Sequence, residues 1–200
     1  MPGASATTTR LRRNYSICFE RPFTVRASST TSAPLPRAAG WGPPIAGGTR
    51  IGHVHLKVAD IDRSLAFYCG VLGFELMQRS GDSVAFIAAG GYHHHIGLNT
   101  WQSRGGTPPP RHHTGLFHTA IVYPTRAALG DALRRLVAAG IPLEGASDHG
   151  VSEALYLSDP DQNGVELYRD KPEAEWPRNP DGTLAMVTER LDLEALQAAA

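Results

Sequence analysis

The sequence predicts an α+β fold made of two paired βαβββ modules. Three observations support this prediction. A strand, a helix and three more strands follow one another between residues 51 and 100, and the same order returns between 115 and 169. Each predicted helix begins after a good N-cap residue, Asp60 or Thr125. The chain's last hairpin alternates apolar and polar residues on both sides of a dense turn.

The first module opens with a strand over 51–58, in which His53, His55 and Lys57 share one face. Apolar residues then recur near helical spacing over 61–72, which predicts a helix packed on the sheet. Glycine-containing turns separate the remaining strands of this module. We expect those strands over 74–78, 83–88 and 92–100.

The second module repeats this order after a Gly- and Pro-rich loop. A strand over 116–122 carries His118, and leucines with helical spacing predict a helix over 126–139. Three strands complete the module. We expect them over 142–146, 151–158 and 165–168, the last two joined by the turn-forming run Asp159 to Gly164.

These modules form one predicted domain over 49–170. The segment 1–48 is rich in Arg and Ser and has a single acid, Glu20. It is typical of either a disordered extension or an organelle transit peptide. The segment 171–200 is predicted to be a polar, Pro-broken tail that ends in a short helix.

Composition excludes several function classes. The formal net charge is zero, so nothing favours nucleic acid or an anionic membrane as a partner. There is no apolar run long enough for a transmembrane helix. Cys18 and Cys69 are far apart and are expected to be free thiols, which indicates a reducing compartment, the cytoplasm.

The repeat gives the histidines and one carboxylate defined positions. His55 lies on the first strand of module one, His118 on the first strand of module two, and Glu166 on the last strand of module two. A carboxylate on a core strand is costly unless a positive group meets it. Two imidazoles and one carboxylate predict a divalent metal site: Fe(II) first, with Mn(II), Zn(II), Co(II) or Ni(II) as alternatives.

The chain resembles the vicinal oxygen chelate superfamily, which contains glyoxalases, extradiol dioxygenases and fosfomycin-resistance proteins. Three stretches carry the resemblance: HVHLKVADIDRSLAFYCGVLGFEL, GLFHTAIVYPTRAALGDALRRL and YLSDPDQNGVELY. It implies paired βαβββ modules around a divalent metal, with His55, His118 and Glu166 at the ligand positions. The stretch GGYHHHIGLNTW is most similar to catechol 2,3-dioxygenase-like members.

The resemblance also implies catalytic residues. In ring-cleavage members a Tyr lies ten residues before the Glu ligand, as Tyr156 does here, although a half-buried core tyrosine is an equal alternative. His149 matches a substrate-contacting histidine. Alternation places His93 and His95 on one strand face, and we expect His95 at the metal's edge; the alternative is an exposed edge strand.

One position departs from the dioxygenase pattern, because the usual acid/base histidine would fall at Ser103. The resemblance therefore supports three functions. The first is an iron-dependent extradiol dioxygenase of aromatic catabolism, acting on a catecholic substrate with O2. The others are a glyoxalase-type isomerase or lyase, and a non-catalytic protein that binds an aromatic ligand. We expect a homodimer, and modules exchanged between chains would let two chains supply the ligands.

Overall fold

The computed structural model describes residues 43–110 and 112–200 of the 200-residue chain. The expected N-terminal extension therefore lies almost wholly outside the described residues. Within the described part, no helix has the length and apolar character needed to cross a membrane.

The first module forms a four-stranded sheet with the order β1-β4-β3-β2. Its helix begins where Asp60 accepts a hydrogen bond from the Arg63 N–H at 2.8 Å. The last turns of that helix, η1, are wound as a π-helix. In chain order the elements are β1 (Val54–Lys57), α1 (Ile61–Leu65), η1 (Ala66–Val71), β2 (Glu75–Ser80), β3 (Val84–Ala88) and β4 (Ile96–Asn99).

The second module repeats this topology in a sheet with the order β5-β8-β7-β6-β9. The Thr125 side chain caps its helix at the Ala128 N–H. The chain then continues through a short 3-10 turn to an added edge strand and a final helix. These elements are β5 (Thr119–Val122), α2 (Arg126–Ala138), β6 (Gly145–Asp148), β7 (Ser152–Ser158), β8 (Gly164–Asp170), η2 (Glu173–Glu175), β9 (Glu189–Arg190) and α3 (Leu193–Ala198).

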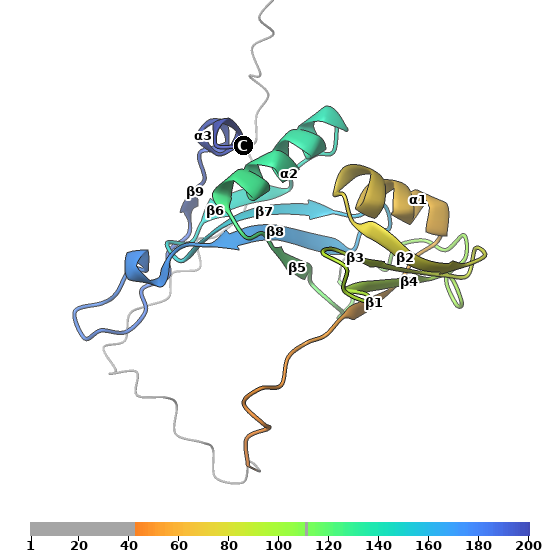
Figure 1. Ribbon diagram of the computed structural model, residues 1–200, viewed down its shortest axis with the longest axis horizontal. Helices are drawn as coiled ribbons and strands as arrows, with labels where there is room; N and C mark the ends of the chain where they lie inside the picture. The colour runs from red at the N-terminus through yellow and green to blue at the C-terminus, as the bar shows by residue number, and fades with distance from the viewer. Residues whose placement is uncertain (1–42, 111) are drawn as a thin grey trace, which may run out of the picture.

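The helices cover one face of each sheet and leave the other face open (Figure 1). Alternation along the strands sends Leu56 and Leu98 of the first sheet, and Leu155 and Leu167 of the second, toward the helices. All four belong to one continuous cluster of buried residues. The predicted paired βαβββ fold is thus confirmed, and the residues that alternate with this core face outward.

The turn between β7 and β8 joins the two modules. The carboxylate of Asp159 is buried and accepts a hydrogen bond from the Tyr68 hydroxyl of η1 at 3.1 Å. Asp161 accepts from the Ala59 N–H at 3.1 Å and pairs with Arg63. This turn is therefore an intermodule contact as well as a hairpin loop.

Several predicted strand boundaries differ from the structure, and the strand expected over 142–146 is observed over Gly145–Asp148. The strand expected over 92–100 begins only at Ile96, so His93, His94 and His95 lie in the preceding loop. Gly90 and Gly91 both have positive φ, which turns the chain away from β3 before it can pair again. His118 directly precedes β5, and the tail adds β9 to the second sheet.

Candidate active site

The open face of the second sheet brings together three of the predicted site residues. Cross-strand pairing places Tyr156 of β7 opposite Glu166 of β8, and Glu166 beside Ala120 of β5. Thr119 is paired with Val165, so His118, one residue earlier, lies beside Gly164 on the face that carries Glu166. The strand period of two therefore accounts for the shared orientation of these groups.

His118 and Glu166 form a close pair. Nε2 of His118 lies 3.0 Å from Oε2 of Glu166, and their side chains are 31% and 14% exposed. Nδ1 of His118 is buried and has no hydrogen-bond partner. An imidazole nitrogen and a carboxylate oxygen that converge in this way are a suitable partial ligand set for a divalent metal.

Tyr156 and His149 extend this pair along the sheet. The Tyr156 hydroxyl lies 2.8 Å from Nε2 of His149, which follows β6. Burial raises the pKa of Tyr156, and the charge and hydrogen bonding of Glu166 raise it further. The phenol therefore stays protonated at neutral pH and can act as a hydrogen-bond donor.

His55 lies on the open face of the other sheet. Its ring packs between Phe86 and Trp101, with ring centroids 6.0 and 5.5 Å away, and lies over Gly97 of β4. Burial, and then the neighbouring His53, lower the pKa of His55, which favours the neutral imidazole that a metal requires.

The three predicted ligands do not meet in one chain. Across residues 43–110 and 112–200, no group of three or more His, Cys, Asp or Glu side chains is arranged to hold a metal ion. His118 and Glu166 fit two ligand positions, whereas the third predicted ligand, His55, lies in the other sheet. A single copy thus offers a partial metal site.

His95 occupies a different environment from the one expected. It lies in the loop before β4, where its Nδ1 accepts a hydrogen bond from the Ala89 N–H at 3.3 Å. Its ring packs 4.7 Å from that of Tyr92. Residues 93–95 are not part of a strand, so the alternation expected of His93 and His95 does not hold.

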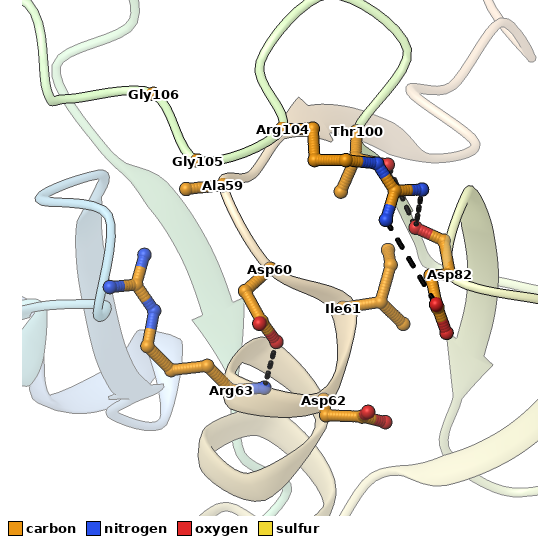
Figure 2. Close-up of a pocket in the computed structure, with 10 residues that line it drawn as sticks. All are labelled: Ala59, Asp60, Ile61, Asp62, Arg63, Asp82, Thr100, Arg104, Gly105 and Gly106. Atoms are coloured by element: carbon orange, nitrogen blue, oxygen red, sulfur yellow. Dashed lines mark hydrogen bonds and ion pairs between the residues drawn. The ribbon is translucent and has the colours of Figure 1, made fainter.

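A pocket of about 480 Å³ lies elsewhere, at the start of α1 (Figure 2). Its charged lining groups already have partners: Asp60 accepts from the Arg63 N–H, and Arg104 donates to the Asp82 carbonyl oxygen. None of the predicted site residues lines this pocket. It therefore lies apart from the His118–Glu166 pair.

Two glycines pack closely against the candidate ligands, and the sequence alone did not predict this contact. A Cβ on Gly97 would lie 2.9 Å from the His55 ring, and one on Gly164 would overlap the Phe117 carbonyl oxygen beside His118. Each glycine lies two residues before a polar residue that faces the same side, Asn99 or Glu166. The matched spacing in the two modules was the signal that could have revealed them.

Comparison with known proteins places the chain in a family. Residues 50–167 match the model of the Glyoxalase/Bleomycin resistance protein/Dioxygenase superfamily, which is more than half of the chain. The chain belongs to this superfamily. The fold with paired modules and the matched family model agree on this assignment.

Two curated relatives are dioxygenases. The chain is 44% identical over 148 residues to the catechol-2,3-dioxygenase of Bacillus subtilis (strain 168), which covers 74% of this chain and 51% of that protein. It is 32% identical over 123 residues to biphenyl-2,3-diol 1,2-dioxygenase 3 of Rhodococcus globerulus, covering 60% of this chain and 63% of that protein. The chain thus spans half to just under two thirds of these relatives.

A solved structure supports the fold. A glyoxalase/dioxygenase from Nostoc punctiforme superimposes with a TM-score of 0.55 and 18% identity, covering 66% of this chain and 99% of that one. At this identity the likeness concerns the fold alone. Superfamily membership and dioxygenase-like relatives are therefore established, and the reaction itself is a matter for proposal.

Proposed function

We propose that this protein is an extradiol ring-cleavage dioxygenase that acts on a catecholic substrate with Fe(II) and O2. The observation that carries the proposal is the His118–Glu166 pair, 3.0 Å apart, with the Tyr156 phenol on the adjacent strand. The 44% identity to a catechol-2,3-dioxygenase supports the same reaction class. Glu166 is the negative ligand expected of a two-His, one-carboxylate iron site.

His118 and Glu166 would hold the iron together with His55. When bound, the metal supplies Lewis acidity and open positions for two substrate oxygens and O2. Tyr156 stays protonated and donates to or accepts from a substrate hydroxyl, because its pKa is raised by burial and by Glu166. His149, 2.8 Å from the phenol, is suited to accept a proton. We assign no step to His95.

We further propose that the protein is a homodimer in which His55 of one copy completes the pair of the other. Each open sheet face carries one part of the ligand set: an imidazole on the first sheet, and an imidazole with a carboxylate on the second. Large apolar residues are exposed beside these faces, including Trp101 at 64% and Phe117 at 86%. Exposed apolar patches of this kind favour association.

Metal content and O2 uptake test the reaction. The protein would be purified anaerobically, reconstituted with Fe(II) and given a panel of catechols in an oxygen electrode. We expect one iron per site, O2 consumption and a yellow ring-cleavage product, all lost in Glu166→Ala. Metal binding without O2 uptake for any catechol would instead indicate isomerase or lyase chemistry. If the protein binds no metal, the non-catalytic function, binding of an aromatic ligand, would be favoured instead.

Mixing two inactive variants tests the shared site. His55→Ala and Glu166→Ala each damage every site of their own homodimer. A mixed dimer with shared sites keeps one intact site, so refolding the two together should restore about a quarter of the wild-type activity. The control mixes Glu166→Ala with His118→Ala, which lie on the same half and should not complement. No recovery in the first mixture would contradict the two-chain site.

A further inference from the structure

The C-terminal segment after β8 returns to the β6 edge of the second sheet. The Trp176 indole donates to the Lys171 carbonyl oxygen at 2.8 Å, and the Ala185 N–H donates to the Pro177 carbonyl oxygen at 2.8 Å. β9 then pairs antiparallel with β6, which leads directly into His149. The segment lies beyond residue 167, where the family match ends.

This segment contacts His149 through both its backbone and its ring. The Val187 N–H donates to the His149 carbonyl oxygen at 3.2 Å. Nδ1 of the His149 ring lies 3.1 Å from the Val187 carbonyl oxygen and 3.3 Å from the Thr188 hydroxyl oxygen. On the other side of the ring, Nε2 lies 2.8 Å from the Tyr156 hydroxyl.

The Val187 carbonyl decides which ring nitrogen carries the proton. A carbonyl oxygen can only accept a hydrogen bond, so Nδ1 of His149 must be the donor. In a neutral imidazole the other nitrogen, Nε2, is then a bare acceptor. The Tyr156 phenol has a competing acceptor in its cross-strand neighbour Glu166. A bare Nε2 at 2.8 Å draws the phenol proton toward His149 instead.

We propose that Val187 is a positioning residue, and that its carbonyl holds His149 in the Nδ1–H tautomer so that Tyr156 donates to Nε2. The phenol oxygen is thereby left to accept a hydrogen bond from a substrate hydroxyl. This catalytic consequence rests on the proposed dioxygenase function, whereas the tautomer does not. The C-terminal segment is accordingly part of the site, through the backbone and ring contacts that it makes with His149.

The tautomer can be measured directly. Long-range proton–nitrogen correlation spectra of 15N-labelled full-length protein, metal-free and Zn(II)-loaded, distinguish protonated from bare ring nitrogens. The His149 signals are assigned by their loss in His149→Gln. We expect a protonated Nδ1 and a bare Nε2 in the neutral ring. A protonated Nε2 with a bare Nδ1 would overturn the proposal.

Two variants test the role of the segment. Val187→Pro removes the N–H that ties this residue to His149, and should release the ring from its tautomer. Thr188→Val keeps both the shape and the carbonyl, and should leave the tautomer unchanged. An unaltered tautomer in a folded Val187→Pro protein would refute the positioning role. If this variant does not fold, the wild-type spectrum still decides the proposal.

Activity separates this inference from the proposed function. With an active enzyme, Val187→Pro should lower kcat about tenfold and leave KM nearly unchanged, because the phenol loses its fixed orientation. If the protein shows the expected tautomer but consumes no O2, the dioxygenase proposal is contradicted and the assignment of the His149 tautomer is supported. If the protein consumes O2 but carries a protonated Nε2 on His149, the tautomer assignment is contradicted and the dioxygenase proposal is supported.

Discussion

The two modules carry the same backbone geometry and different chemistry. In the first, His55 lies over Gly97 and the residue two positions later on the same face is Asn99. In the second, His118 lies beside Gly164, and the equivalent residue is Glu166. Asn99 is 7% exposed, and its side-chain oxygen accepts a hydrogen bond from the Trp101 N–H at 3.2 Å.

This difference shows where the negative charge of the site comes from. The Asn99 side chain accepts a hydrogen bond from a backbone N–H, whereas the Glu166 carboxylate lies against the His118 imidazole. A symmetric pair of modules with a carboxylate in each would offer two negative ligands. The asymmetric pair offers one, which matches the two-His, one-carboxylate set of an open iron site.

The largest expected effect comes from making the second module like the first. Glu166→Asn removes the negative ligand and should weaken metal binding more than about 100-fold, with a matching loss of O2 uptake. Metal content by mass spectrometry and an oxygen electrode measure the two losses. Asn99→Asp is the matched control, since it alters the equivalent position of the other module. If Glu166→Asn binds iron normally, the proposed ligand set is wrong.

A second substitution tests how tightly the backbone is packed beside His118. In Gly164→Ala the new methyl group would overlap the Phe117 carbonyl oxygen, which belongs to the backbone and cannot rotate away. We expect a loss of about 2–3 kcal/mol in the free energy of unfolding, the cost typical of overpacking. Urea denaturation measures this loss. An unchanged urea midpoint would show that β8 and the residues before β5 can move apart without loss of stability.

Sequence patterns predicted the modules well because caps, strand alternation and turn residues are local signals. Thr125, Asp60 and Asp192 each cap the helix that follows them. The arrangement of the ligands in space could not be predicted from the sequence. Whether His55 meets His118 depends on how two sheets sit in space, which no spacing along the chain encodes.

The strand predicted over residues 93–95 was wrong for a different reason. Residues 93–95 have a strand-like neighbourhood, but positive φ at Gly90 and Gly91 and the Ala89–His95 hydrogen bond turn them into a loop. The pairing of β9 with β6 was equally hidden, because a two-residue strand has no periodicity to detect. Long-range contacts made by short segments account for most of what the sequence did not predict.

Gly97→Ala should have a smaller effect than Gly164→Ala, although the two glycines are equivalent. The new methyl group would lie 2.9 Å from the His55 ring, a side chain that can swing aside. We expect less than about 1 kcal/mol of lost stability and about a tenfold weaker affinity for the metal, because the ligand is displaced. Isothermal titration with Zn(II) and urea denaturation separate the two quantities. If Gly97→Ala lost as much stability as Gly164→Ala, the expected difference between a movable side-chain neighbour and a fixed backbone neighbour would be contradicted.

The last comparison concerns β9, the strand present only in the second sheet. Burial would raise the pKa of Asp148 on β6, but hydrogen bonds from Lys171 and from the Gly150 N–H outweigh it and hold the pKa below its usual range. A carboxyl with a lowered folded-state pKa stabilises the fold above its unfolded pKa of about 3.9, and that stability is lost as the pH falls through the folded-state pKa.

Asp148→Asn should therefore lower the free energy of unfolding by about 1 kcal/mol at pH 7, and the difference from the wild type should shrink as the pH falls below about 4. Urea denaturation at pH 7, 5 and 3 measures the difference. Asp62→Asn, at a side chain that is 74% exposed, is the control and should change stability little at any of these pH values. A constant difference between wild type and Asp148→Asn down to pH 3 would mean that Asp148 acts through packing alone. In that case the ion pair to Lys171 would not hold the β6 edge to which β9 is attached.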